Sequence, residues 1–381
     1  MNTQNTKSIL AVAILSALSL SACNLDVNVN GETMATLTTT KTGVIVDLNK
    51  GITVNGVTYD TSEATVINNG LESDPSSLKN GMLVSVSGIE NSDGTGKAVT
   101  IFYEDEVKGV VLTNNVTADN TGTLNVMGQT VQVDKDTVFQ SFDVADLKIS
   151  DIDKDNVVEV SGYASGDGEI WATRIEVKDS QYNDGDQVEL KGNISGLTQT
   201  SFMIGNQVIN TENAALDNDF MGSFQAGQYV EVKSDFGFDA DGVLLASEID
   251  LKGEGSKEVS HTENDDQIEI KGVITSAFIS NELEVNGSTI LIGQNTQASN
   301  VNMSQLDKGV IVEVEGYIDS NGNLVATKLE VESSFDESAN NDDTESTGDN
   351  DDTSGLGSSG SNEDDSRNEV NELENSDNDN D

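Results

Sequence analysis

The fold of this chain can be read from residues 157–175, VVEVSGYASGDGEIWATRI. In the first part of this stretch apolar and polar side chains alternate, as they do when successive residues point to opposite faces of a β-sheet. The turn Ser165–Gly168 then supplies glycines, which adopt the positive φ that a tight hairpin needs. A second alternating run follows from Glu169. The stretch therefore predicts two antiparallel strands joined by a short turn.

The same pattern occurs four times along the chain. Each copy has an opening strand with a glycine, a tight turn with a glycine, a small residue nine positions later, a valine-rich strand and a closing hairpin. The opening glycines are Gly43, Gly109, Gly192 and Gly272, and the turn glycines are Gly56, Gly128, Gly205 and Gly287. The small residues are Thr65, Thr137, Ala214 and Thr296, and the closing strands carry Ala98, Ala172, Ala246 and Ala326. Four copies with these offsets predict four tandem structural repeats.

We expect an all-β fold class: four tandem small antiparallel β-barrel modules, similar to oligonucleotide- or oligosaccharide-binding (OB) barrels. An open sheet of five or six short strands would leave its edges exposed, and closure removes them. A small sandwich is the alternative. Polar linkers predict modules that stand apart like beads on a string. The predicted modules are residues 42–106, 107–179, 187–253 and 267–333.

The third copy departs from the pattern. Its turn has Gly205 one position early, Ala214 replaces a threonine, and Ser234 stands where the other valine-rich strands end in glycine. We expect this copy to be the most divergent in fold or use.

The N-terminus predicts a bacterial lipoprotein. Residues 1–22 have the features of a secretory signal: Lys7 is followed by an apolar run that is too short to span a bilayer. The stretch from Leu20 to Cys23 resembles the lipobox, so we expect cleavage between Ala22 and Cys23 and lipidation of Cys23, the only cysteine. An ordinary signal peptide is the alternative. Two or three acyl chains, such as palmitate, would give a stable anchor.

The residues around the lipid predict the location. Asn24 follows Cys23 where an aspartate would favour the inner membrane, so we expect the outer membrane of the cell envelope, facing either the periplasm or the outside. Residues 23–41 would form a tether. At the other end, residues 334–381 contain one basic residue, Arg367, among many acidic ones, which predicts a disordered acidic tail.

Net charge excludes one class of partner. The chain has 68 acidic and 19 basic residues and a formal net charge of −49. A polyanion repels phosphate backbones, so we expect no nucleic-acid partner despite the OB-like prediction.

The repeated pattern resembles the bacterial domain-of-unknown-function 5666 family, whose members carry small all-β modules in exported proteins and lipoproteins. The resemblance rests on the glycine openings, turns such as Val54-Asn55-Gly56, the threonines nine residues on and the closing alanine strands. It covers residues 42–333. The family implies no activity, and its motif positions have the character of structural positions.

The sequence offers little for catalysis, and we expect neither an enzyme nor a cofactor. The single histidine, His261, lies in a charged linker, and the single cysteine is assigned to the lipid. A conventional zinc site or a cysteine- or histidine-based triad is therefore excluded. A carboxylate-only enzyme such as a glycosidase stays open, but the four copies share no acidic pair at one matched position.

Calcium is the alternative ligand, because hard cations prefer clustered oxygens. Weak candidates are Asp235, Asp239 and Asp241 in one loop and Asp319 in another. Asp and Asn beside Gly are typical of hairpin turns, which is the interpretation we favour. We expect Trp171 to pack in the fold rather than to stack on a sugar.

Taken together, these features predict a non-catalytic, lipid-anchored envelope protein with a structural or interaction role. Its partners would be the membrane, through the lipid, and an envelope protein or polysaccharide. A binding module for a small solute, glycan or Ca²⁺ is the alternative.

Overall fold

The structure is a computed structural model. It describes residues 28–29, 32–33, 39–117, 120–216, 222–252, 267–286, 288–299, 301, 303, 306–319 and 323–334. The predicted signal sequence and the predicted tail from residue 335 onward lie outside these residues. The four repeats belong to one compact unit, Met1–Asn341.

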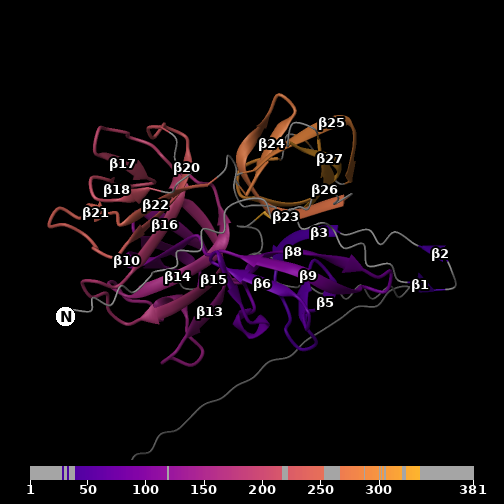
Figure 1. Ribbon diagram of the computed structural model, residues 1–381, viewed down its shortest axis with the longest axis horizontal. Coiled ribbons are helices and arrows are strands. Elements are labelled where there is room, and N and C mark those ends of the chain that lie inside the picture. Colours follow the sequence, from indigo (N-terminus) through magenta and orange to yellow (C-terminus); the bar gives the residue numbers. More distant parts are fainter. Residues whose placement is uncertain are drawn as a thin grey trace, which may run out of the picture. The chain divides into compact units, whose positions relative to one another are not determined.

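The described residues form strands, with two three-residue 3₁₀ turns (Figure 1). The leading pair is β1 Asn28–Val29 and β2 Glu32–Thr33. Repeat 1 holds β3 Thr39–Val44, β4 Ile52–Val54, β5 Val57–Asp60, β6 Thr65–Asn68, β7 Leu71–Ser73, η1 Pro75–Ser77, β8 Leu83–Glu90 and β9 Thr95–Tyr103. Repeat 2 holds β10 Val107–Val116, β11 Gly122–Val126, β12 Gln129–Val133, β13 Val138–Ser141, η2 Ile149–Asp151, β14 Val157–Ala164 and β15 Glu169–Asp179.

Repeats 3 and 4 follow the same plan. Repeat 3 holds β16 Val188–Asn193, β17 Ser201–Ile204, β18 Gln207–Asn210, β19 Ala215–Leu216, β20 Tyr229–Ser234, β21 Leu244–Leu245 and β22 Glu248–Leu251. Repeat 4 holds β23 Gln267–Ile279, β24 Glu282–Val285, β25 Ser288–Ser299, β26 Val310–Ile318 and β27 Leu324–Ser334. Among the described residues, no helix has the length and apolar character needed to cross a membrane.

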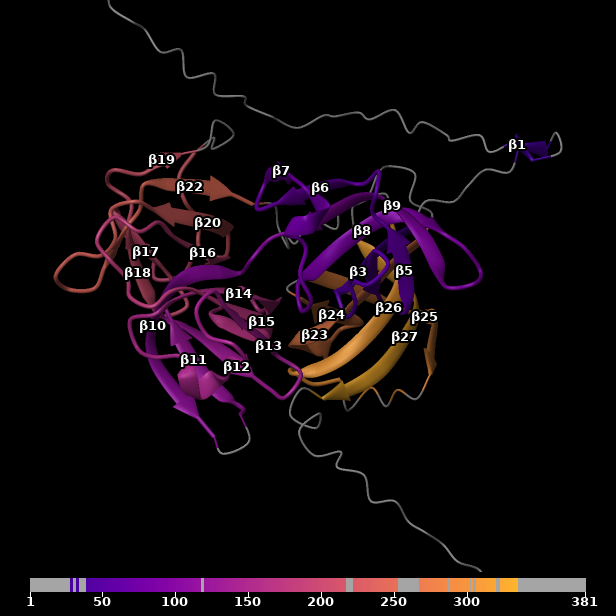
Figure 2. The same ribbon diagram turned by 90° about the horizontal axis from the view of Figure 1, so that it is seen from below.

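The strand order is clearest in repeats 2 and 4. In repeat 2, β10 pairs with β11 and β14, β12 pairs with β11, and β15 lies between β12 and β14. Repeat 4 repeats this order with β23, β24, β25, β27 and β26 (Figure 2). Two pairs of neighbouring strands are parallel: β12 with β15, and β25 with β27. The all-β class and the four repeats are therefore confirmed, but a purely antiparallel arrangement is wrong.

The prediction of separate closed barrels also needs correction. Strand β10 pairs with β11 only from Val111 onward, and at its beginning Val107 and Lys108 pair with β16 of repeat 3. In the same way, the start of β3 in repeat 1 runs parallel to β23 of repeat 4. The start of each of these strands thus pairs with its own repeat on one side and with the first strand of another repeat on the other, so the first strands of the two repeats cover each other's edges. The repeats are joined edge to edge, as in repeat proteins.

The apolar cores follow the same grouping. Repeats 2 and 3 share one continuous core cluster, which includes Val107 and Leu190. Repeats 1 and 4 each have their own cluster. A smaller cluster connects Leu83 of repeat 1, Tyr163 and Trp171 of repeat 2, and Val273 of repeat 4. Each repeat alone is small for a stable core, and shared burial offsets this.

The opening and closing motifs have steric causes. At the opening, the first turn residue packs across the glycine: a Cβ on Gly109 would lie 2.1 Å from Met127 Sδ, and one on Gly43 would lie 2.1 Å from Asn55 Oδ1. At the close, a Cβ on Gly162 would lie 2.2 Å from the carbonyl oxygen of Trp171. At Gly162 the clash is with backbone, so only glycine fits, whereas at Gly43 and Gly109 a larger residue would displace the Asn55 and Met127 side chains.

The recurring threonine has a hydrogen-bonding cause. Thr137 Oγ1 donates to the carbonyl of Ala172 at 2.8 Å, and Thr296 Oγ1 donates to that of Ala326 at 2.8 Å. The threonine and alanine of the motif therefore meet across neighbouring strands.

Repeat 3 departs where the sequence does. Ser234 replaces the closing glycine, and its hydroxyl donates to the carbonyl of Leu245 at 2.6 Å. The final strand is divided there into β21 and β22. Gly205 packs against repeat 2: a Cβ on Gly168 would lie 2.5 Å from Gly205 Cα. A larger residue at this turn would push repeats 2 and 3 apart.

Candidate functional site

Several residues singled out in the sequence lie outside the described part of the chain. Among them are Ala22 and Cys23 at the expected lipidation site, and His261 in the linker. Their predicted roles stay predictions.

The calcium candidates are used in turns. Asp239 Oδ1 accepts the backbone N–H groups of Asp241 and Val243, both at 2.9 Å. Asp235 Oδ1 accepts Gln187 Nε2 at 2.9 Å, and Asp319 Oδ1 accepts the N–H of Asn323 at 2.9 Å. Within the described ranges, no group of three or more His, Cys, Asp or Glu side chains could hold a metal ion. The carboxylates of Asp239 and Asp319 thus close hairpin turns, whereas that of Asp235 accepts from Gln187, just before β16.

Trp171 packs inside the assembly of repeats. Its side chain belongs to the cluster that connects repeats 1, 2 and 4 and is 4% exposed. Lys308 of repeat 4 lies over the ring, with Nζ 5.5 Å from the ring centroid, and also pairs with Glu169. This is within the range of a cation–π contact. The ring is therefore an inter-repeat contact.

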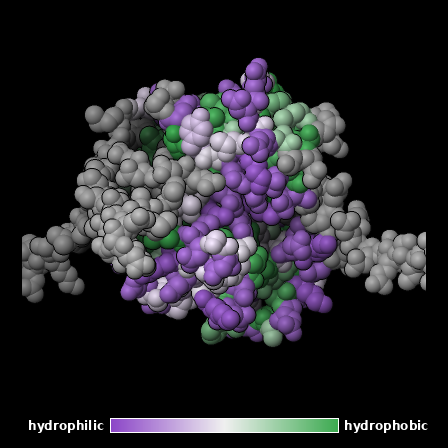
Figure 3. All heavy atoms as spheres, turned by 90° about the vertical axis from the view of Figure 1, so that its right-hand side faces the viewer, coloured by the Kyte–Doolittle hydropathy of each residue, from purple (hydrophilic) through white to green (hydrophobic). Residues whose placement is uncertain are grey.

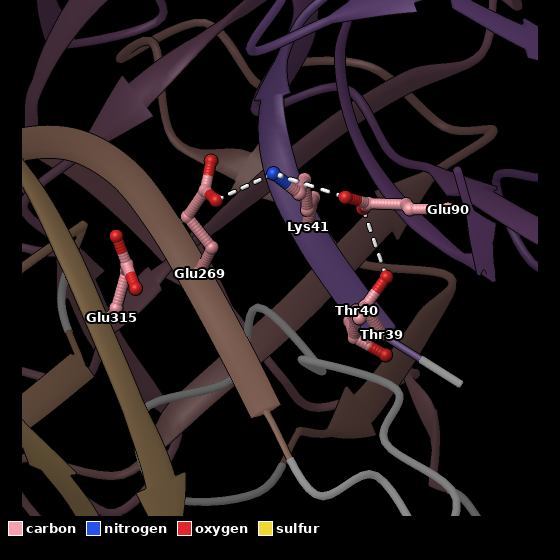
Figure 4. Close-up of a pocket in the computed structure, with 6 residues that line it drawn as sticks. All are labelled: Thr39, Thr40, Lys41, Glu90, Glu269 and Glu315. Carbon is pink, nitrogen blue, oxygen red and sulfur yellow. Dashed lines mark hydrogen bonds and ion pairs between the residues drawn. The ribbon is translucent and has the colours of Figure 1, made fainter. Parts of the chain in front are cut away.

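A pocket of about 240 Å³ opens where repeats 1 and 4 meet (Figure 4). Lys41 of β3 reaches between Glu269 of β23, with Nζ 2.6 Å from Oε2, and Glu90 of β8, at 3.4 Å. Glu90 also accepts hydrogen bonds from Thr39 and from the buried Tyr59 hydroxyl. The remaining lining residues are Thr40 and Glu315.

This polar cluster is particular to repeat 1. Strand register places Lys41 at the position of Val107, Leu190 and Ile270 in the other repeats. Likewise, Tyr59 takes the place of Val131, Ile209 and Ile290. Gly96 makes room for the larger ring, since a Cβ there would lie 2.8 Å from Tyr59 Cδ1. Repeat 1 has thus exchanged aliphatic side chains for a hydrogen-bonded polar set.

The electrostatics of the pocket hold its groups in fixed charge states. Burial alone lowers the pKa of Lys41, but hydrogen bonds and charges from Glu269 and Glu90 outweigh it, and the net shift is upward. Burial, together with the hydrogen bond to Glu90, raises the pKa of Tyr59 far above its ordinary value. An ammonium and a neutral phenol are poor nucleophiles and poor bases near pH 7. Chemically, the arrangement is an ionic joint between two repeats.

A second joint lies between the repeat 1–2 linker and repeat 3. Lys191 of β16 is 4% exposed at its side chain and lies within 3.9 Å of Glu104, Asp105, Glu189 and Glu231. Its Nζ also donates to the carbonyl of Asp105 at 2.8 Å. Among the four carboxylates, Glu104 and Asp105 belong to the linker and Glu189 and Glu231 to repeat 3.

The sequence analysis did not find either joint. Aligning the four openings offers one signal for the first: Lys41 stands where the other copies have aliphatic residues. Lys191 offers none, because lysines also precede the glycine at Lys108 and Lys271. Its burial depends on a linker and a repeat that are distant in sequence.

The fold and these joints define a class, the tandem all-β repeat proteins. The family model "Domain of unknown function (DUF5666)" matches residues 42–101, 108–176, 191–250 and 271–330, and the chain belongs to this family. No curated protein sequence matches it.

Among solved structures, one similar chain is described as a multidomain protein with nucleic acid binding domains from Streptococcus pneumoniae TIGR4. It shares 12% identity, and the match covers 57% of this chain and 74% of that one, with a TM-score of 0.14. The two chains do not superpose as wholes.

Proposed function

We propose that this protein is a non-catalytic, lipid-anchored scaffold of the bacterial cell envelope that presents four joined repeats to an envelope protein or polysaccharide. Its net charge of −49 disfavours nucleic acid as a partner.

 The observation that carries this proposal is the joining of the repeats. Strand pairing ties repeat 2 to repeat 3 and repeat 1 to repeat 4. The half-buried Lys41 lies at the joint of repeats 1 and 4, and the buried Lys191 lies at the joint with repeat 3. Such joints hold the binding faces of separate repeats in one arrangement, which suits a scaffold.

The surface supports an interaction role. Hydrophilic side chains cover much of the face in Figure 3, with smaller hydrophobic areas between them. Several large apolar side chains are exposed on different repeats, among them Phe142, Leu71 and Ile279. With a net charge of −49, a partner that meets this surface would need cationic or neutral polar groups.

The anchor is tested by labelling and fractionation of the full chain. We expect the wild-type protein to incorporate radioactive palmitate and to sediment with outer membranes. The Cys23→Ser variant should lose the label and the membrane association. Membrane association that persists in Cys23→Ser would contradict the anchor, and sedimentation with inner membranes would contradict the assigned location.

The second candidate function is a binding module, and the pocket at Lys41 favours it. The pocket combines three carboxylates with one ammonium and two threonine hydroxyls, so a small cationic or hydroxyl-rich solute fits its chemistry. A glycan array probed with the full chain separates the two functions. Binding that is lost in Glu315→Gln would favour the binding module, whereas a pull-down of an envelope protein that is unaffected by Glu315→Gln would favour the scaffold.

A further inference from the structure

The linker between repeats 1 and 2 is short and acidic, and two of its three residues, Asp105 and Glu106, are buried. Residues Glu104, Asp105 and Glu106 connect β9 to β10. The Asp105 side chain is 2% exposed, and Asp105 also exchanges hydrogen bonds with Asn69 of repeat 1. Because Lys191 binds the Asp105 carbonyl, this linker is fastened to repeat 3 as well. Three repeats therefore meet at these residues.

The charges at this joint do not balance. Lys191 contacts all four carboxylates, while Lys252 also pairs with Glu104 and Glu231, and Lys233 with Glu231, so three ammonium groups serve these carboxylates unevenly. Asp105 Oδ1 and Glu189 Oε1 are buried without a hydrogen bond, and Lys191 Nζ lies 3.9 and 3.4 Å from them. A buried carboxylate oxygen without a donor is costly. Glu189 and Glu231 both contact Lys191 Nζ, at 3.4 and 3.3 Å, so their buried carboxyl groups lie beside each other. Two neighbouring carboxylates repel when both are charged, and a proton on one of them removes that repulsion.

The wider surroundings do not remove the excess of negative charge. Eight carboxylates and five cations lie around the joint, together with the phenols of Tyr103 on β9 and Tyr229 on β20. The carboxylates are Glu104, Asp105 and Glu106 of the linker, Glu159 of β14, Glu189 of β16, Glu231 of β20, and Glu248 and Asp250 of β22. The cations are Arg174 and Lys178 of β15, Lys191 of β16, Lys233 of β20 and Lys252 after β22.

We propose that this joint is a proton-dependent latch, which holds the linker against repeat 3 while one of the neighbouring carboxyl groups of Glu189 and Glu231 carries a proton and loosens when that proton leaves. Loss of the proton would place two adjacent buried carboxylates in the charged state. Their repulsion would act directly on β16, whose Lys191 holds the linker. The latch is a conformational device of the repeats themselves and does not depend on the lipid anchor.

The pKa directions agree with this geometry. Burial first, and then the neighbouring carboxyl group of Glu231, raises the pKa of Glu189 to about 9. Burial also raises the pKa of Asp105 to about 7, against the opposing charge of Lys191. Burial alone would raise the pKa of Glu231, but the neighbouring Glu189 and the nearby lysines lower it, so Glu231 is the charged member of the pair. The latch would thus be closed at mildly acidic pH and open above about pH 9.

Hydrogen–deuterium exchange on the full chain tests the latch. Rates corrected for the intrinsic effect of pH would be compared at pH 6 and pH 9.5, for peptides that contain Glu104–Val107 and Val188–Asn193. We expect protection to fall by roughly tenfold or more in both peptides, since one pKa unit corresponds to a tenfold change in population. Unchanged protection in the wild type would overturn the proposal.

Two variants sharpen the test. Glu189→Gln is neutral at every pH and nearly the same shape, so its linker should stay protected at pH 9.5. The matched control is Glu269→Gln at the other joint, which should keep the wild-type pH response in the linker. A Glu189→Gln protein that loosens as the wild type does would show that another group controls the joint.

Discussion

Both joints of this molecule combine strand pairing with a lysine that contacts several carboxylates, but the lysine is buried more deeply at one joint than at the other. Between repeats 1 and 4, β3 and β23 run parallel, and the Lys41 side chain, 13% exposed, contacts two carboxylates beside an open pocket. Between repeats 2 and 3, β10 and β16 run antiparallel, and Lys191, 4% exposed, contacts four. The deeper joint is therefore the one in which removal of a charge, or of a proton, should have the larger effect.

The largest expected effect comes from removing the buried ammonium. Lys191→Met leaves four carboxylates without their central cation and should lower the free energy of unfolding by about 3–5 kcal/mol. Lys41→Met should cost less, because its partners also have Tyr59, Thr39 and Asn55 as donors. Urea unfolding of both variants checks this order. Equal losses would mean that the two joints do not differ in depth.

Next in size is the response of stability to pH. The raised pKa of Glu189 means that the folded state binds more protons than the unfolded state between about pH 5 and pH 9. The free energy of unfolding should therefore fall as pH rises through this window, by on the order of a few kcal/mol. Urea titrations at several pH values measure it. If the free energy of unfolding rises with pH between about pH 5 and pH 9, the proton is not on Glu189 in the folded state.

A smaller effect is expected at the glycine contact between repeats 2 and 3. Gly168→Ala would place a Cβ 2.5 Å from Gly205 Cα, at a φ of +97°. Gly94→Ala is the matched control: it has a φ of +81°, and the nearest atom is 3.8 Å away. Both variants share the backbone strain, but Gly168→Ala should cost about 1–3 kcal/mol more from overpacking. Thermal unfolding of the two variants measures the difference in their stability. Equal stability would show that the contact between Gly168 and Gly205 contributes nothing to the joint.

The smallest effect is expected away from both joints. Lys97 and Glu63 form an exposed ion pair within repeat 1, with side chains 45% and 71% exposed. Lys97→Ala should leave the urea midpoint unchanged within error, because solvent screens such pairs. A clear loss of stability here would show that surface charge, rather than burial, governs the response at the joints.

Much of each repeat could be predicted from local sequence. Alternation predicted the valine-rich strands, and the turn at Ser165–Gly168 has positive φ at Gly166 and Gly168. The repeated offsets of glycine, threonine and alanine predicted the four repeats, and the structure shows why they recur: Thr137, for example, donates to the carbonyl of Ala172 on the neighbouring strand. These features succeed because the interacting residues lie within one hairpin or one repeat.

The joining of repeats could not be predicted in the same way. The pairing of Lys41 with Glu269 connects residues 228 positions apart, and no local pattern encodes it. The third repeat carried a partial signal: Gly205 and Ser234 were recognised as departures, but their reasons, contact with Gly168 and a hydrogen bond to Leu245, required the structure. The sequence predicted only a boundary between modules after residue 106, whereas the buried Asp105 and Glu106 beside it are part of the joint.

The most direct test of the joined repeats is zero-length carbodiimide cross-linking of the dilute full chain, read by mass spectrometry. Pairs within one repeat, Lys178–Glu176 and Lys328–Glu315, serve as positive controls. Joined repeats predict additional cross-links between repeats, at Lys252–Glu104 and Lys308–Glu169, in monomeric protein. Cross-links confined to single repeats would contradict the account and restore the picture of four independent modules.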